Sequence, residues 1–243
     1  MHAIEINGLC KRYGDKVAVN DLSLCVETGE LLALLGLNGA GKTTTVRMLS
    51  CLCRPTKGDA RLLGKSVTED ATAVKALIGV SPQESATAPN LTVEENLMLV
   101  ARLHGLPRER ARARIAELSE IFSFDGVMKQ KSKTLSGGWQ RRLSIAMALV
   151  SEPQILFLDE PTLGLDVLAR RELWGLIRSL KGKVTIILTT HYLEEAEALA
   201  DRVAIMANGA LCAHGTVEEL KARAVADSFE DAFVAMSRGE GTV

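Results

Sequence analysis

The sequence predicts an α/β fold, in which a mostly parallel β-sheet is covered by helices. Three observations support this prediction. Short apolar runs alternate with helical patterns from residue 154 onward. A glycine-rich loop, residues 36–41, joins another apolar run to a helix near the N-terminus. Residues 84–150 are nearly all helical in pattern, which indicates a helical subdomain inserted between two sheet-forming parts.

Length and composition are those of a globular protein. The 243 residues are 47% hydrophobic and 24% charged, so the chain can bury a sizeable core. The net charge of -1 and the 4% aromatic content argue against a nucleic-acid binder. The sequence lacks a signal-peptide pattern and an apolar run long enough to span a membrane. We therefore expect a cytoplasmic protein whose membrane-spanning partners, if it has them, are other chains.

The first elements follow from short patterns. Residues 22–26 alternate apolar with polar or small side chains, and Leu31–Leu35 is an apolar run that ends at a glycine, so both are predicted strands. The pattern over residues 42–52 is helical, and Pro55 prevents its continuation. Residues 77–80 form a further predicted strand.

The cysteines are odd in number and scattered, which is typical of reduced thiols: Cys10, Cys25, Cys51, Cys53 and Cys212. Cys51 and Cys53 are expected on the first helix with their side chains pointing apart. Buried thiols are therefore favoured, and a metal site is the alternative.

The helical insertion contains start and break signals. Thr92 is a suitable N-cap, and Glu95 three residues later completes a capping box. The sequence Gly105-Leu106-Pro107 ends this helix, and a second helix begins at Pro107. Four arginines lie on two adjacent ridges of the second helix, Arg108 with Arg112 and Arg110 with Arg114. A solvated face is favoured for them, with an anion or lipid contact as the alternative.

The C-terminal half alternates regularly between helix and strand. The predicted elements are a helix over 137–150, a strand over 154–158, a helix over 166–180, a strand over 184–188, a helix from Tyr192 and a strand over 202–206. This order requires right-handed crossovers between parallel strands. Phe229 and Phe233 lie on one face of a short amphipathic helix. We divide the chain into one domain, 1–225, and a short tail, 226–243.

A phosphate-binding loop is the most specific motif. Its sequence, Gly36-Leu37-Asn38-Gly39-Ala40-Gly41-Lys42-Thr43, fits G-x-x-x-x-G-K-[ST] and lies between a buried strand and a helix. The glycines let backbone N–H groups surround phosphates at the helix N-terminus. Lys42 adds positive charge toward the β- and γ-phosphates, and Thr43 offers a hydroxyl to Mg²⁺.

Two further motifs complete the predicted chemistry. The apolar strand before Asp159 and Glu160 places one carboxylate to hold Mg²⁺ through its water shell and the other to polarise a water in line with the γ-phosphate. Ser136, Gly137 and Gly138 open another helix as a second anion site. The chain must therefore bind two phosphate groups or share each nucleotide with a second copy.

Together these motifs resemble the ATP-binding subunits of ABC transporters, in particular the bacterial drug-exporter type. The phosphate loop, Ser136-Gly137-Gly138, Asp159-Glu160-Pro161-Thr162, Gly164-Leu165-Asp166 and His191 occur in the order and spacing of that family, from about Ile4 to Arg223. The resemblance implies the sheet core of P-loop NTPases, with the inserted helical subdomain and an antiparallel β portion at the N-terminus. It also implies ATP hydrolysis with Mg²⁺.

The resemblance assigns roles to further residues. It implies that Tyr13 stacks on adenine, that Gln83 reaches Mg²⁺ and senses the attacking water, and that His191 contacts the γ-phosphate. It implies that Asp166 crosses a dimer interface. The implied nucleotide-binding set also holds the loop residues Gly36, Leu37, Asn38, Gly39, Ala40, Gly41, Lys42, Thr43 and Thr44 with Ser136, Gly137 and Gly138. The implied metal set is Thr43, Gln83 and Asp159, and the implied catalytic set is Glu160, His191, Gln83 and Lys42.

The resemblance also implies partners: separate transmembrane permease subunits, and a second copy of the chain or a homologous ATPase subunit, at the cytoplasmic face of the membrane. The chain departs from the family at Trp139, where glutamine is usual. A soluble ABC ATPase acting on ribosomes or DNA is the alternative, but such proteins usually carry two domains or long coiled coils. A GTPase is disfavoured because the sequence contains no Asn-Lys-x-Asp.

Overall fold

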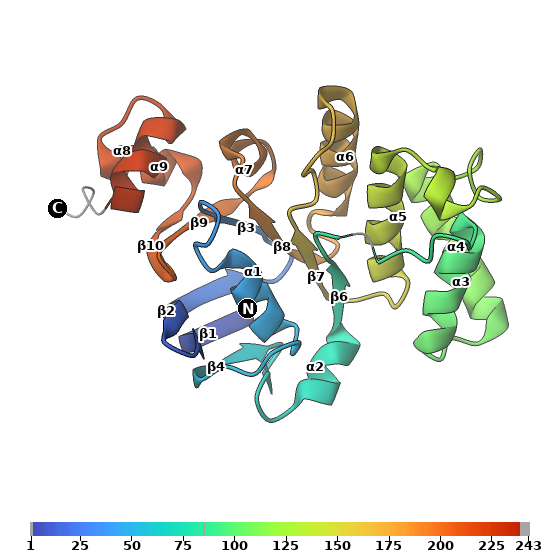
Figure 1. Ribbon diagram of the computed structural model, residues 1–243, viewed down its shortest axis with the longest axis horizontal. Helices are drawn as coiled ribbons and strands as arrows, with labels where there is room; N and C mark the ends of the chain where they lie inside the picture. The colour runs from blue at the N-terminus through green and yellow to red at the C-terminus, as the bar shows by residue number, and fades with distance from the viewer. Residues whose placement is uncertain (1, 85, 239–243) are drawn as a thin grey trace.

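The computed structural model describes residues 2–84 and 86–238, which form two β-sheets flanked by helices (Figure 1). The strands are β1 His2–Tyr13, β2 Lys16–Glu27, β3 Leu31–Leu35, β4 Lys57–Leu62, β5 Lys65–Ser66, β6 Ile78–Ser81, β7 Ile155–Asp159, β8 Thr185–Thr190, β9 Arg202–Ala207 and β10 Ala210–Gly215. The helices are α1 Lys42–Leu49, α2 Ala71–Leu77, α3 Val93–Leu103, α4 Arg108–Phe122, α5 Gly137–Leu149, α6 Val167–Leu180, α7 Leu193–Leu199, α8 Val217–Ala224 and α9 Phe229–Arg238. Within the described residues, none of these helices has the length and hydropathy to cross a membrane.

The larger sheet has the strand order β10-β9-β3-β8-β7-β6, and the smaller sheet has the order β2-β1-β4-β5. All neighbouring pairs of the larger sheet are parallel except β10 with β9. The smaller sheet is antiparallel and comes from the N-terminal part. Strand β3 lies between β8 and β9, so the carboxyl ends of β3, β7 and β8 meet at one edge, where parallel α/β sheets bind ligands. The predicted fold class is confirmed.

The central strands are buried on both faces. Leu32 and Leu34 of β3 face a core shared with the antiparallel sheet and α1, as does Phe157 of β7. Leu156 and Leu158, the alternate residues of β7, face a second core formed with α3 to α6. This double burial explains why the strands are continuous apolar runs without a polar face.

Helices α3, α4 and α5 lie together at one end of the molecule (Figure 1). Thr92 caps α3, and both hydrogen bonds of the capping box with Glu95 are present. Two of the four arginines of α4 contact residues at or just after the end of α5. Arg110 forms an ion pair with Glu152 at 2.6 Å, and Arg114 Nη2 donates a hydrogen bond to the carbonyl of Leu149 at 2.8 Å. These contacts fasten α4 to the end of α5.

The first helix is shorter than predicted. Helix α1 ends at Leu49, because Cys51 adopts a left-handed backbone with φ of 55°. The prediction that Cys51 and Cys53 lie on this helix is therefore wrong. In the described part of the chain no group of three His, Cys, Asp or Glu side chains is arranged to hold a metal ion.

Helix α9 covers the sheet beside β3. Its buried side chains Phe229, Phe233 and Met236 pack against Val203 and Ile205 of β9. The predicted apolar face of this segment is confirmed.

Candidate nucleotide-binding site

The phosphate-binding loop depends on glycine at its two ends. A Cβ on Gly36 would lie 2.4 Å from the carbonyl oxygen of Met206, and a Cβ on Gly41 would lie 2.6 Å from that of Ala18. Gly41 also has φ of 103°, which favours glycine. It is the N-cap of α1 and offers no side-chain cap, so the helix start is left for a ligand's negative charge.

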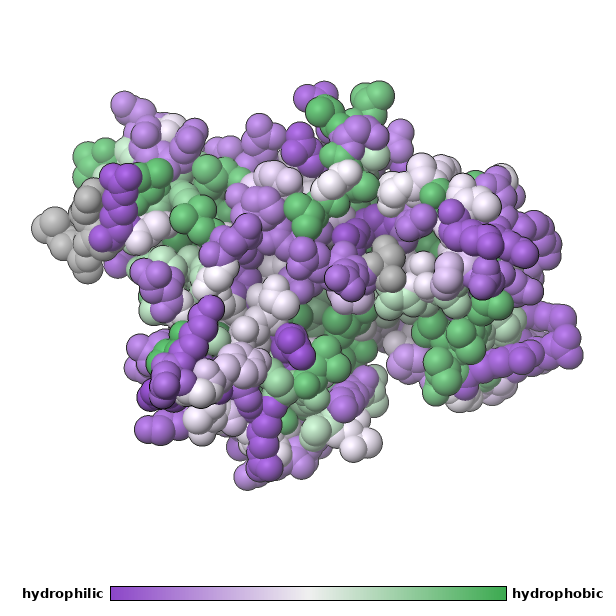
Figure 2. Space-filling model, in the orientation of Figure 1, coloured by the Kyte–Doolittle hydropathy of each residue, from purple (hydrophilic) through white to green (hydrophobic). Residues whose placement is uncertain are grey.

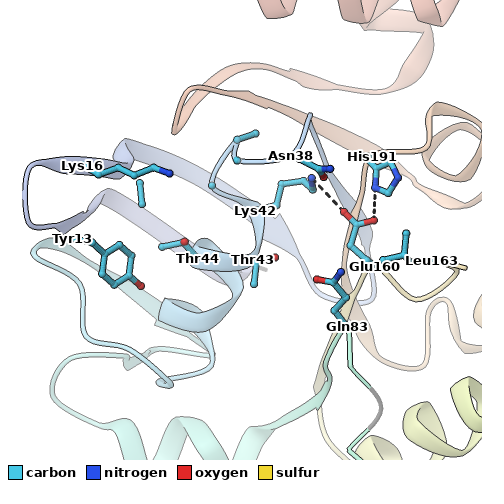
Figure 3. A pocket seen from close by; sticks show the side chains of 14 residues that line it. Tyr13, Lys16, Asn38, Lys42, Thr43, Thr44, Gln83, Glu160, Leu163 and His191 are labelled. Carbon is cyan, nitrogen blue, oxygen red and sulfur yellow. Dashed lines mark hydrogen bonds and ion pairs between the residues drawn. The ribbon is translucent and has the colours of Figure 1, made fainter.

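An open pocket of about 500 Å³ lies against this loop (Figure 3). Its lining joins segments far apart in the sequence: Tyr13, Lys16, Ala18, Asn38, Gly39, Ala40, Gly41, Lys42, Thr43, Thr44, Gln83, Glu160, Leu163 and His191. The carboxyl ends of β3, β7 and β8 bring the loop, Glu160 and His191 together.

A buried network runs across the pocket floor from Lys42 through Glu160 to His191. Lys42 Nζ lies 3.3 Å from Glu160 Oε1, and His191 Nδ1 lies 2.7 Å from Glu160 Oε2. Lys42 also donates to the carbonyl of Gly36 at 2.7 Å. Lys42 and Glu160 are only 5% and 6% exposed, so their attraction is weakly screened by solvent. The site thus holds its cation and its carboxylate ready next to each other.

The backbone at Glu160 is in the left-handed region, with φ of 49°. Such a conformation costs a non-glycine residue about 1–2 kcal/mol. Strand β8 holds it in place, because the Glu160 N–H donates to both the carbonyl and the hydroxyl of Thr189. The bend ends β7 and turns the carboxylate toward Lys42 (Figure 3).

The oxygen donors beside this network suit Mg²⁺. Thr43 Oγ1 donates to Asp159 Oδ1 at 3.2 Å, and the hydroxyl of Thr189 donates to the same carboxylate oxygen. The amide of Gln83 points into the same region from below Glu160 (Figure 3). Carboxylate, hydroxyl and amide oxygens are hard ligands, so the residues present fit the magnesium ion expected from the sequence.

Tyr13 lies at the rim of the pocket on the end of β1. Its ring is half-exposed, with the Lys11 ammonium 5.1 Å from the ring centroid. Desolvation, and then the nearby Cys53 thiol, raise the pKa of the Tyr13 phenol above its usual value. The ring therefore stays neutral at physiological pH and offers a flat face to a ligand's base.

The second predicted anion site lies outside this pocket. Ser136 is the N-cap of α5, as predicted, and its side chain makes no cap hydrogen bond. Ser136, Gly137 and Gly138 do not line the pocket that holds Lys42. Asp166 caps α6 through the N–H groups of Leu168 and Ala169.

Trp139 is held within its own subdomain. The Arg142 guanidinium lies 4.7 Å from the Trp139 ring centroid, and the ring of Phe124 lies 6.1 Å away. The Trp139 side chain therefore packs against Arg142 of the same helix and against Phe124, just after α4.

Two buried ionisable residues near the site were not predicted. Glu195 is fully buried and accepts a hydrogen bond from the Trp174 indole, and burial raises the pKa of its carboxyl. Arg141 is buried in α5 beside Gln83. The signal in both cases was a charged residue at an apolar position of an amphipathic helix.

Comparisons with known proteins agree with this geometry. A family model described as "ABC transporter" matches residues 19–163. The daunorubicin resistance ATP-binding protein DrrA3 of Streptomyces coeruleorubidus is 46% identical, over 94% of this chain and 72% of its own length. The Nod factor export ATP-binding protein I of Burkholderia orbicola is 45% identical, over 89% of this chain and 72% of its own.

Solved structures show the same architecture. A structure described as the ATP binding subunit of an ABC transporter superposes with a TM-score of 0.86 at 29% identity, over 97% of this chain and 99% of that chain. The dimeric structure of MJ0796, a bacterial ABC transporter cassette, superposes with a TM-score of 0.78 at 26% identity, over 88% of this chain and 98% of that chain.

Proposed function

Because this chain belongs to the ABC transporter family as an ATP-binding subunit, an ATPase, we propose that it is the motor of an exporter. In this proposal two copies enclose two ATP molecules with Mg²⁺ and drive separate transmembrane permease subunits at the cytoplasmic face of the membrane. The export direction is supported by relatives named for daunorubicin resistance and Nod factor export. The ribosome- or DNA-acting alternative is not favoured by these relatives. Residues 1–225 would be the ATPase domain, 84–150 its helical subdomain and 226–243 a tail.

The main support for a shared site is that the two predicted anion sites lie apart within one chain. The chain gathers Lys42, Glu160 and His191 in one pocket, while the helix start at Ser136 lies outside it. One chain therefore provides two incomplete halves of a phosphate site. A second copy that brings its own Ser136 to this pocket would complete both halves at once.

The residues of the pocket suggest how hydrolysis proceeds. Lys42 exchanges its pairing with Glu160 for the phosphates, which frees the carboxylate. Glu160 then accepts a proton from the attacking water, and His191 orients the carboxylate and the γ-phosphate. Thr43, Gln83 and Asp159 would hold Mg²⁺, which neutralises phosphate charge when it is bound.

A groove next to Gln83 supports contact with a permease. It has a volume of about 500 Å³ and lies between α1, α2, α3 and α5, with Pro82 in its lining. Leu52 at this groove and Leu103 nearby are 61% and 76% exposed. Figure 2 shows hydrophobic surface over the lower end of α3 and, across a hollow, on the α2 side. Such paired apolar surfaces are typical of protein contacts.

A heterodimer tests the shared site. One protomer carries Lys42→Ala and its partner carries Ser136→Arg. In the shared arrangement both lesions fall in one site, so the closed heterodimer should still trap one nucleotide. Nucleotide trapped per dimer is measured, with the parent expected to trap two.

The matched control places both lesions in one protomer opposite an unchanged partner. In the shared arrangement each site then contains one lesion, and trapping should be lost. If the control traps nucleotide and the first heterodimer does not, each chain builds its own site and the proposal is wrong.

A further inference from the structure

Arg141 connects α5, the helix whose N-cap is Ser136, to the loop that carries Gln83. Its side chain lies in α5 and is 6% exposed. One terminal nitrogen, Nη1, donates to the carbonyl of Pro82 at 2.8 Å, and the other, Nη2, donates to the carbonyl of Gln83 at 2.7 Å. The planar guanidinium therefore holds two consecutive carbonyls across a separation of 58 residues from Gln83.

A second contact joins the same two segments. The hydroxyls of Ser81 and Ser144 are 2.9 Å apart and buried, and Ser144 lies about one turn of α5 after Arg141. Residues Ser81, Pro82 and Gln83 are thus all held by one face of α5. Two side chains of α5 therefore anchor the end of β6 and the loop that follows it.

The charge of Arg141 lies in an unusual environment. Burial lowers the pKa of its guanidinium, and the charges of Asp159 and Glu195 oppose that shift. Among the residues that the structure describes, no carboxylate lies within ion-pair distance of it. A buried cation that has carbonyl partners but no carboxylate partner is costly, so its position calls for a reason other than stability.

The position of Gln83 gives that reason. Its amide extends into the pocket below Glu160 (Figure 3). The two hydrogen bonds from Arg141 hold the main chain at Gln83, from which this side chain extends.

We propose that Arg141 is a positioning residue that fixes the main chain at Gln83, so that the Gln83 amide reaches the metal and water of the nucleotide. Because Ser136 is the N-cap of α5, Arg141 also links this site to the helix start that serves the partner's nucleotide. This inference rests on the proposed function.

A double-mutant cycle tests the proposal. The full chain is prepared as the parent, Arg141→Met, Gln83→Ala and the double variant, and kcat, the Mg²⁺ concentration for half-maximal activity and ATP binding in EDTA are measured. Misplacing a catalytic group costs about 10²-fold in rate. We expect Arg141→Met to lower kcat by about that factor and to raise the Mg²⁺ requirement, with ATP binding in EDTA unchanged. The double variant should be no slower than the slower single variant.

The control is Arg178→Met. Arg178 also donates two hydrogen bonds to the main chain, at 3.1 and 3.0 Å to the carbonyl of Ala198, but it joins α6 to the end of α7 away from the pocket. It should retain the parent's kcat and Mg²⁺ requirement.

The following outcomes decide the question. Losses that multiply in the double variant, or normal kcat in Arg141→Met, would overturn the proposal. If Arg141→Met does not fold, Arg141→Lys is used instead, and it should show a smaller loss that again disappears in the Gln83→Ala background. A parent that binds no ATP and hydrolyses none would contradict the proposed function and not this inference alone.

Discussion

Replacing Glu160 by glutamine isolates the proton-accepting step. The amide has the size of the carboxylate and can keep a hydrogen bond to His191, which now lies 2.7 Å away. It also keeps the left-handed backbone that Thr189 supports. What changes is the charge 3.3 Å from Lys42 and the ability to accept a proton.

The expected effects on turnover and on binding differ. Loss of a general base lowers the rate by about 10² to 10⁴-fold, which is about 3 to 5 kcal/mol in the activation barrier. The attraction between unit charges 3.3 Å apart is about 5 kcal/mol at an effective dielectric constant of 20, before desolvation is counted. ATP no longer has to replace that attraction when Lys42 turns to the phosphates. Its affinity should therefore stay level or rise.

The assay combines phosphate release with light scattering after size exclusion in ATP and Mg²⁺. We expect the Glu160→Gln variant to accumulate as an ATP-bound dimer with little turnover. Glu218→Gln is the matched control, because this side chain is 83% exposed and does not line the pocket. Turnover within about threefold of the parent in the Glu160 variant would refute the base role.

Three further predictions concern the rim of the nucleotide pocket, the packing of α9 and the pH dependence of stability. Tyr13→Ala should weaken ATP binding by about fivefold, about 1 kcal/mol of stacking, whereas Tyr13→Trp should bind like the parent in equilibrium titration; equal binding by both would remove the stacking role. Phe229→Ala should lower the free energy of unfolding in urea by about 3 kcal/mol, and the more exposed Val234→Ala should change it by less than about 0.5 kcal/mol; equal losses would contradict the packing of α9. Burial raises the pKa of Glu195 above 4.5, so its protonated form stabilises the fold at low pH and that contribution is lost as pH rises through the raised pKa. Glu195→Gln should therefore flatten the decline of urea stability with rising pH, and an unchanged slope would contradict this reasoning.

Much of the fold could be predicted because its central strands are buried on both faces. Leu31–Leu35 is buried throughout, and so is β7, which makes each a continuous apolar run. The antiparallel strands were harder. Strand β4 reads Lys-Gly-Asp-Ala-Arg-Leu, and only its last three positions show the alternation of a half-buried strand.

The end of α1 could not be predicted for a related reason. Residues 51–53 continue the apolar pattern of the helix, but Cys51 adopts the left-handed region and the N–H groups of Leu52 and Cys53 both donate to the carbonyl of Arg47. Local periodicity carries no information about such a turn, because it is closed by main-chain hydrogen bonds and has no glycine or asparagine at its left-handed position.

The predicted site residues divide in the same way. The phosphate loop and the carboxylates after β7 have local motifs, so Lys42 and Glu160 could be identified from the sequence. The bond from Arg141 to the carbonyl of Gln83 joins residues 58 positions apart through a main-chain oxygen. No residue type marks a main-chain acceptor, so this contact required the structure.

The place of β3 between β8 and β9 has a consequence for how the chain is made. Leu31 begins β3, and its N–H donates to Asp201, which follows 170 residues later, just before β9. At about 5–20 residues per second, a ribosome needs roughly ten to thirty seconds to make that interval. Until β8 has been made, at residues 185–190, β3 has neither of its neighbours in the sheet, and β9 follows only at residues 202–207. A nascent chain that stalls before residue 185 would leave β3 without a partner strand on either side. The strand order therefore delays the burial of β3 until residues beyond 185 have been made.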